Sequence, residues 1–403
     1  MKSLKELLVY GPGPSSSHTI GPYRILKDFL NRYPNRAFLD HIEITLFGSL
    51  ALTGKGHSTD DILRTAVGSI PCTVLFNPSL TGLTHPNTLE AKAIYKDGSV
   101  YAKRYISIGG GAFAFEGEKP FGKEAYPFST CDGLKAYMKE NKIADIYEVI
   151  RTFDDSDIYE YGKTMLFRSF HTIEDALSKT GTLPGPLKLE RVARSILSSA
   201  RAEDDPAEQR ILLLSAYAYA TSEANAAGEM IVTAPTCGAA GVVPAVLYYS
   251  YHDKGAPEKD LVKAYLVGAL FCQFIKENAG VSGALLGCQS EVGSATSFAS
   301  ASLAYLYHLP LFGIEYAAEV GMEHFLGLTC DPVDGYVQIP CIERNAMAAL
   351  HAYGAYLYAK HISLFRKNRV SFDNVIRAMK ETGAELSPDL KETSLGGLAK
   401  VCS

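Results

Sequence analysis

The sequence contains no apolar run long enough to cross a membrane. Its longest apolar stretches, such as 265–274, end well before the roughly 20 residues that a spanning helix requires. The first residues, 1–13, contain no apolar core of signal-peptide length. We therefore expect a cytoplasmic protein with no membrane partner.

An excess of basic residues is also missing. The chain has 39 Lys and Arg against 44 Asp and Glu, which gives a net charge of −5. A nucleic-acid-binding protein should carry a basic surface, so this balance argues against nucleic acid as a partner. With 403 residues, the chain exceeds the length at which one hydrophobic core usually stops growing. We expect two domains.

The sequence does contain eight cysteines. Without a secretory signal these should be thiols, so a cysteine in an unusual local context is a candidate for metal binding or catalysis. A free cysteine is otherwise usually a small buried hydrophobic residue. We expect that simpler role for Cys72, Cys131 and Cys272.

The first third of the chain has the pattern of an α/β domain. Alternating and β-branched segments predict strands at 41–47, 72–76 and 100–108. Helical spacing of apolar residues predicts helices at 24–31 and 60–67.

Beyond a domain boundary that we place near residue 135, the pattern is almost entirely helical. Long Ala-, Leu- and Tyr-rich runs, separated by short segments with Gly and Pro, cover residues 210–230, 261–277, 294–307 and 343–361. The predicted fold class is α+β, with an N-terminal α/β domain at 1–135 and a mostly α-helical domain at 136–403.

Three of the interruptions contain a cysteine beside glycine, acidic or amide residues: 282–293, 327–345 and the C-terminal 391–403. Cys288 lies between glycines just before a predicted helix, where backbone N–H groups favour a thiolate. Ten residues with Pro and Gly separate Cys330 from Cys341, and such a loop can fold back so that both face one metal centre. Three cysteines would leave one iron of a four-iron cluster open to a substrate. The spacing alone is equally compatible with zinc or with buried structural cysteines.

Two glycine-rich loops in the first domain each contain a histidine. The segment 11–22 contains three serines and His18, and the segment 48–60 contains His57, Thr59 and Asp60. Consecutive N–H and hydroxyl donors suit a carboxylate ligand. Ordinary helix capping by Ser or Thr is the alternative for either loop alone.

A third polar loop, 233–241, joins two predicted helices. It contains threonines and glycines that could donate hydrogen bonds to a ligand. A sharp helix–helix connection explains the same composition equally well.

Taken together, these segments resemble the iron–sulfur-dependent L-serine dehydratases, in the single-chain form that fuses the family's β and α chains. The matching motifs run in the family's order over nearly the whole chain: GPSSSHT (13–19), TGKGHSTD (53–60), HPNT (85–88), GGG (109–111), LPG (183–185), EANAAG (223–228), TAPTCGAAG (233–241), GCQSEVG (287–293), LTCDPVDGYVQIPCIERNAM (328–347) and KETSLGGLA (391–399).

The resemblance implies a specific cofactor and fold. In this family the cysteines that correspond to Cys288, Cys330 and Cys341 hold a [4Fe–4S] cluster with one open iron. The carboxyl-terminal tail enters the active site, where a near-terminal cysteine, here Cys402, can occupy that iron. The first domain resembles allosteric substrate-binding domains and the second is helical. We also expect a homodimer.

The implied reaction converts L-serine, a small-molecule substrate, to pyruvate and ammonia. A base must remove the Cα proton, and our candidates are His18, His57 and the Cys402 thiolate. We assign carboxylate and ammonium binding to a set of polar side chains in the two histidine loops: Ser15, Ser16, Ser17, Thr59 and Asp60.

The chain departs from the family pattern in three places, the first of which is the loose match of Glu223 and Asn225. Cys237 stands where the family commonly has Asn, which adds a thiol near the expected site. The chain also looks shorter than many members between the GGG and LPG motifs, so substrate preference or regulation could differ.

Two other functions are consistent with parts of the sequence. A pyridoxal-phosphate dehydratase could use Gly109–Gly111 as a phosphate loop, but no lysine lies in an identifiable Schiff-base motif. A non-catalytic amino-acid sensor could use the first domain alone, and loss of the cluster cysteines would favour it. Threonine dehydration and cysteine desulfidation remain open within the family.

Overall fold

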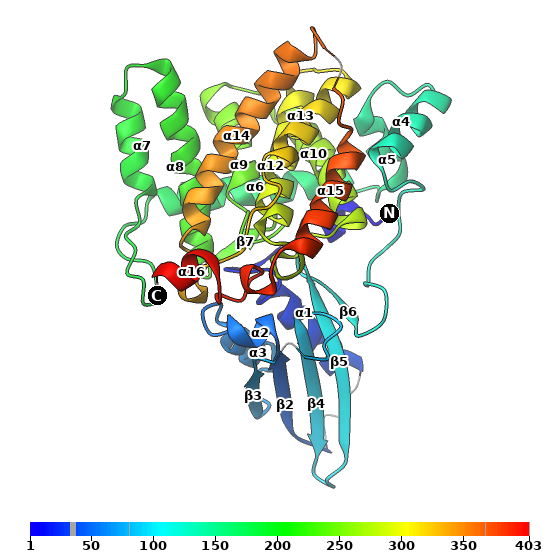
Figure 1. Cartoon of the computed structure of the whole chain (residues 1–403), viewed down its shortest axis with the longest axis vertical. Helices are drawn as coiled ribbons and strands as arrows, with labels where there is room; N and C mark the ends of the chain where they lie inside the picture. The colour runs from blue at the N-terminus through cyan, green and yellow to red at the C-terminus, as the bar shows by residue number, and fades with distance from the viewer. Residues whose placement is uncertain (33–37, 80, 367, 403) are drawn as a thin grey trace.

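The computed structural model describes residues 1–32, 38–79, 81–366 and 368–402. Figure 1 shows a twisted sheet at one end of the molecule and a larger group of helices at the other. This arrangement confirms the predicted α+β fold class, with the β-rich part first in the chain.

The sheet has five strands in the order β3-β2-β4-β5-β6. They are β2 (Leu39–Phe47), β3 (Cys72–Asn77), β4 (Thr88–Tyr95), β5 (Val100–Gly109) and β6 (Ala112–Phe115). Only β2 and β3 run parallel, with Ile44 paired to Val74, and the other neighbours are antiparallel.

One face of the sheet is covered by α1 (Ile20–Arg32) and α3 (Thr59–Val67). The alternation in β2 explains this arrangement, because Ile42, Ile44 and Leu46 all point to the helix-covered face and are fully buried. Helix α1 meets them with an apolar stripe that includes Phe29. The loops that precede α1 and α3 therefore lie at one end of this two-layer unit.

The helical part is built around α12 (Val292–Leu306), in which every residue except Tyr305 is buried. Its neighbours include α9 (Val242–Tyr248), α10 (Glu258–Asn278), α13 (Leu311–Glu323) and α14 (Cys341–Ile362). Helix α12 is rich in Ala and Ser, and these small side chains let the surrounding helices approach closely.

Further helices complete this part of the chain. They are α4 (Cys131–Glu140), α5 (Ile146–Phe153), α6 (Ile158–Leu177), α7 (Ala193–Ala202), α8 (Pro206–Ala226), α15 (Phe372–Glu385) and the terminal α16 (Gly397–Cys402). None of the helices within the described ranges is both long and apolar enough to span a membrane.

A short antiparallel pair connects the two parts. Strand β1 (Tyr10–Pro12) pairs with β7 (Met230–Val232), so the loop that begins at residue 13 is fixed against the helical part. The C-terminal segment also returns to the junction, where the Glu392 carbonyl accepts a hydrogen bond from Oγ of Ser49 in the first domain.

The predicted helices and strands are confirmed, with one correction at residues 210–230. Helix α8 ends at Ala226, Gly228 has a φ of 77°, and Met230 begins β7. A residue with positive φ cannot continue an α-helix, which explains the early end. The domain boundary near residue 135 falls within α4 and stays a prediction.

The buried Glu319 of α13 makes stability pH-dependent. Burial and the neighbouring Glu323 raise the pKa of Glu319 to about 8, so the folded chain keeps a proton that the unfolded chain loses near its ordinary value of 4.5. Stability should therefore fall as pH rises between these values. We expect Glu319→Gln to raise the Tm relative to the parent chain at pH 8.5 but not at pH 4.5. A change of about 1 kcal/mol in the free energy of unfolding corresponds to a shift in Tm of roughly 2–4 °C.

Scanning calorimetry at the two pH values measures this difference. Glu277→Gln, at an exposed position of α10, is the matched control and should change neither Tm. An equal effect of Glu319→Gln at both pH values would contradict the assignment.

Candidate functional site

A small buried cavity lies where the histidine loops of the first domain meet the helical part. It contains all three cysteines that the sequence singled out, and its polar and apolar lining residues come from six separate segments. The lining residues are Ser15, His57, Gly238, Cys288, Glu291, Val292, Cys330, Pro332, Val337, Cys341, Arg344 and Glu392.

Each cysteine is positioned by a different local structure. Cys288 begins a 3-10 turn (Cys288–Ser290) immediately before α12, and Cys341 is the first residue of α14. Cys330 lies in the loop that leads to α14, where its backbone N–H donates to the Leu390 carbonyl at 2.8 Å. The loop between Cys330 and Cys341 folds back, as predicted, and both residues line the same cavity.

The sulfur atoms lie close to a carboxylate. Oε2 of Glu291 is 3.9 Å from Sγ of Cys288 and 4.0 Å from Sγ of Cys330. These three ligand atoms lie within 4.8 Å of one another. The neighbouring Cys288 and burial raise the pKa of Cys330 well above its usual range, and burial raises that of Cys341. Thiolates crowded in this way need a cation or metal centre between them to be stable.

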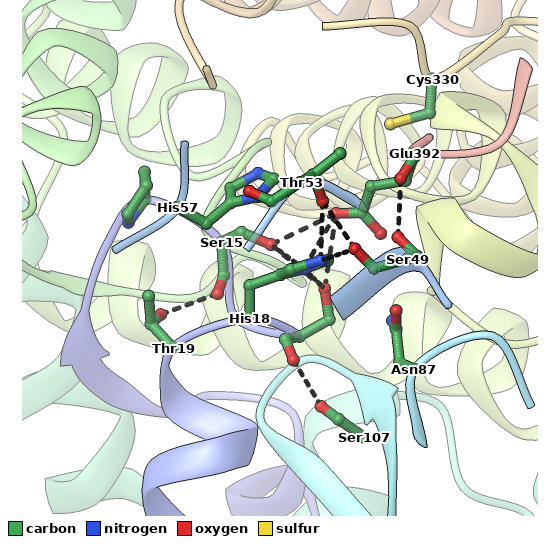
Figure 2. Close-up of polar contacts among 12 residues, drawn as sticks. Ser15, His18, Thr19, Ser49, Thr53, His57, Asn87, Ser107, Cys330 and Glu392 are labelled. Atoms are coloured by element: carbon green, nitrogen blue, oxygen red, sulfur yellow. Dashed lines mark hydrogen bonds and ion pairs between the residues drawn. The ribbon is translucent and has the colours of Figure 1, made fainter. Parts of the chain in front are cut away.

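The two predicted histidines lie against each other on the other side of the cavity. The ring centroids of His18 and His57 are 4.3 Å apart. His18 uses both ring nitrogens: Nδ1 lies 3.0 Å from Oγ of Ser17, and Nε2 lies 2.9 Å from Oγ1 of Thr53. Figure 2 shows this group together with Ser15.

His57 has one ring nitrogen without a partner. Its Nδ1 lies 2.8 Å from the Thr53 carbonyl, which can only accept, so Nδ1 carries the proton. Nε2 then has the lone pair, and within the described residues nothing hydrogen bonds to it although it is buried. Burial and the nearby His18 lower the pKa of His57 well below its usual range. His57 is thus a neutral imidazole with a free basic nitrogen in the cavity wall.

Glu392 links the histidine group to the cysteines. Its Oε1 accepts hydrogen bonds from Oγ of Ser15 at 3.3 Å and Oγ of Ser17 at 3.5 Å, and lies 3.4 Å from Nδ1 of His18. Its backbone N–H donates to the Cys330 carbonyl at 2.8 Å. Figure 2 shows Glu392 between the histidine group and Cys330.

The other predicted site residues lie outside the cavity lining. Ser16 is buried and hydrogen bonds to the Cys237 thiol. Thr59 is buried at the start of α3, and its Oγ1 has no partner among the described residues. Asp60 forms an ion pair with Lys55.

Two cysteines that the sequence placed near the site are not brought to the cavity wall. Cys402 is exposed at the end of α16, and Cys237 is buried beside Ile20 and Ile231. The C-terminal segment does reach the cavity, but the residue that lines it is Glu392, ten residues before Cys402.

Sequence reasoning named Ser15, His57 and the three cysteines as site residues but missed Glu392, Gly238, Val292, Pro332 and Val337 as lining residues. Glu392 belongs to the KETS segment, so a signal was present in the motif. Nothing local to that segment indicated that its glutamate faces the histidine loop, which is more than 370 residues away along the chain.

The chain is similar to known proteins over nearly its whole length. A family model described as the serine dehydratase alpha chain matches residues 134–399, and one described as the serine dehydratase beta chain matches residues 3–74. The chain is 38% identical to an L-serine dehydratase of Streptomyces coelicolor, with 98% of each chain covered. It is 37% identical to L-serine dehydratase 1 of Escherichia coli over 99% of each, and 35% identical to an L-serine dehydratase of Helicobacter pylori over 99% of this chain and 98% of the relative.

Proposed function

The chain belongs to the L-serine dehydratase family and converts L-serine to pyruvate and ammonia, and we propose that it does so in the cavity lined by Cys288, Cys330 and Cys341. The observation that supports this location most strongly is the meeting of three cysteines with a free histidine nitrogen in one buried space.

The proposed cofactor is a [4Fe–4S] cluster held by these three cysteines. The donor set fits such a group: Cys288 from one segment and Cys330 and Cys341 from the two ends of one loop all line the same cavity, the first two buried and Cys341 partly buried. A cluster with three protein ligands supplies one open iron, a Lewis acid that makes hydroxide a better leaving group. The raised thiol pKa values of Cys330 and Cys341 also fit a site that requires a metal centre to hold thiolates.

His57 is the proposed base for the Cα proton. Its Nδ1 proton is held by the Thr53 carbonyl, so Nε2 is left to accept. His18 is a weaker candidate because both of its ring nitrogens already have partners. Burial lowers the pKa of His18 to about 4, which keeps it neutral and suited to positioning His57.

Substrate binding remains assigned to the polar residues of the histidine loops. Ser15 lines the cavity, which supports a role in holding the serine carboxylate. For Ser16, Ser17, Thr59 and Asp60 the assignment rests on the sequence. Four further proposals also rest on the sequence. They are the domain boundary near residue 135, Cys402 as an occupant of the open iron, the homodimer and the cytoplasmic location.

A substitution at Gly283 tests how tightly the side chains around the cysteines are packed. A Cβ at this position would lie 2.6 Å from Oε2 of Glu291 and 3.2 Å from Sγ of Cys330. We expect Gly283→Ala to displace these two side chains and to lower iron affinity by roughly 10–100-fold, because groups around the ligands orient them. Iron per chain, measured after desalting into buffer with a weak chelator, gives the effect.

Gly238→Ala is the matched control. Its Cβ would meet nothing closer than 3.6 Å, although Gly238 also lines the cavity. Equal iron loss in both variants would contradict the packing argument.

Metal removal tests the proposed function itself. A strong iron chelator added under anaerobic, reducing conditions should abolish pyruvate formation from L-serine, and iron with sulfide should restore it. Activity that survives complete iron removal would contradict the cluster mechanism.

A further inference from the structure

Glu392 is held in the cavity by both parts of the molecule. Its N–H donates to the Cys330 carbonyl at 2.8 Å, and its own carbonyl accepts from Oγ of Ser49 at 2.6 Å. Cys330 belongs to the helical part and Ser49 to the helix that follows β2. The carboxylate is thus positioned from two sides and is only 4% exposed.

The two oxygens of this carboxylate differ in their surroundings. Oε1 is surrounded by Ser15, Ser17 and His18. Oε2 is buried and has no side-chain donor among the described residues; the nearest donor to the carboxylate besides Ser15, Ser17 and His18 is the backbone N–H of Ala284. Buried carboxylate oxygens are normally satisfied by a donor, so an oxygen left open in a cavity wall points to a ligand that brings one.

The charges around the cavity indicate what kind of donor is missing. Glu291 and Glu392 both line it, and the cysteines would add negative charge as thiolates. Arg344 is the only Lys or Arg in the lining, and its guanidinium already binds Asp331 at 3.0 Å and the Thr329 carbonyl at 2.8 Å. A ligand that carries a cationic N–H donor would complement this space.

The position of His57 adds a geometric constraint. A ring nitrogen of His57 and a carboxylate oxygen of Glu392 lie within 4.8 Å of each other. In L-serine the ammonium group and the proton to be removed are both on Cα. A base that reaches the proton therefore has the ammonium group close to it, and Glu392 is the carboxylate that lies near His57.

We infer that Glu392 binds the α-ammonium group of the substrate through Oε2, and that this contact makes the site prefer 2-amino acids to the corresponding acids without the amine. The inference rests on the proposed function, because it takes L-serine as the substrate. Oε1, fixed by Ser15 and Ser17, keeps the carboxylate oriented for this contact.

Two unreactive ligands that differ only in the amine test this inference. L-alanine and propanoate both lack the leaving hydroxyl, so neither is consumed. Their dissociation constants for the iron-loaded chain are measured by calorimetry, and their inhibition constants against L-serine provide a second readout. The parent chain should bind L-alanine at least about tenfold more tightly, since a charge-assisted contact is among the stronger polar interactions.

Glu392→Gln should bring the ratio of the two constants close to one with little effect on iron content, and Glu392→Asp should keep part of the preference. Glu319→Gln is the matched control, since it replaces a buried carboxyl group outside the cavity lining and should leave the ratio unchanged. An unchanged ratio in Glu392→Gln, or equal binding of both ligands by the parent chain, would overturn the inference. A merely structural role of Glu392 would weaken both ligands equally. Failure of the proposed function would instead appear in the parent chain, as absent iron or absent pyruvate.

Discussion

Replacing Cys288, Cys330 or Cys341 by alanine is expected to remove both the iron and the activity, with pyruvate formation reduced at least about a thousandfold. The proposed cluster would lose one of its three protein ligands, and with the cluster the chain would lose the open iron that we propose assists the leaving hydroxyl. A thousandfold loss corresponds to ~4 kcal/mol of transition-state stabilisation. Iron per chain, the visible absorbance of the cluster and the rate of pyruvate formation are measured on the same anaerobic sample.

Other cysteines of the chain supply the controls. Cys272, buried in α10, and Cys402, exposed at the end of α16, lie outside the cavity lining. Cys272→Ala and Cys402→Ala should both keep the cluster. Retention of the chromophore in a variant of Cys288, Cys330 or Cys341 would remove that residue from the ligand set.

Replacing His57 by asparagine should lower kcat by about 10²–10⁴-fold while the iron content stays that of the parent chain. This range is the usual contribution of a positioned general base. Asparagine preserves the hydrogen bond to the Thr53 carbonyl but offers no basic nitrogen at the position of Nε2. Exchange of the Cα proton of L-serine with deuterated solvent, followed by NMR, should be lost together with pyruvate formation.

His351→Asn is the control for the loss of a histidine as such. Its ring is partly buried on α14 and burial lowers its pKa, but it lies outside the cavity lining. It should retain the parent activity. If His57→Asn kept its activity while His18→Asn lost it, the base would be His18, and the assignment drawn from the ring hydrogen bonds would be wrong.

Strands with a strong local pattern were predictable from the sequence. In β2 the alternation of Ile42, Ile44 and Leu46 with polar residues is the direct result of one buried face. Strand β4 (TLEAKAIY) was missed because Ala, Lys and Glu have low strand propensity. Its conformation is set by pairing with β2 and β5 on its two sides, which is tertiary information.

The site was predictable to the extent that its chemistry appears in short motifs. Cys330 and Cys341 share one loop, and the residues between them indicated that it would fold back. Glu392 could not be placed in this way, because its role arises from a contact between the C-terminal segment and the first domain. The role of Cys402 was expected from the family resemblance alone; the residue is exposed at the end of α16, and its place at the open iron stays a prediction.

The most direct test of the central claim is made under anaerobic conditions. The chain is reconstituted with iron and sulfide, and iron per chain and pyruvate from L-serine are measured in the same sample. We predict about four irons per chain, as one [4Fe–4S] cluster requires, together with pyruvate formation in proportion to the iron bound. Pyruvate formation without bound iron, or activity that appears only when pyridoxal phosphate is added, would contradict the account.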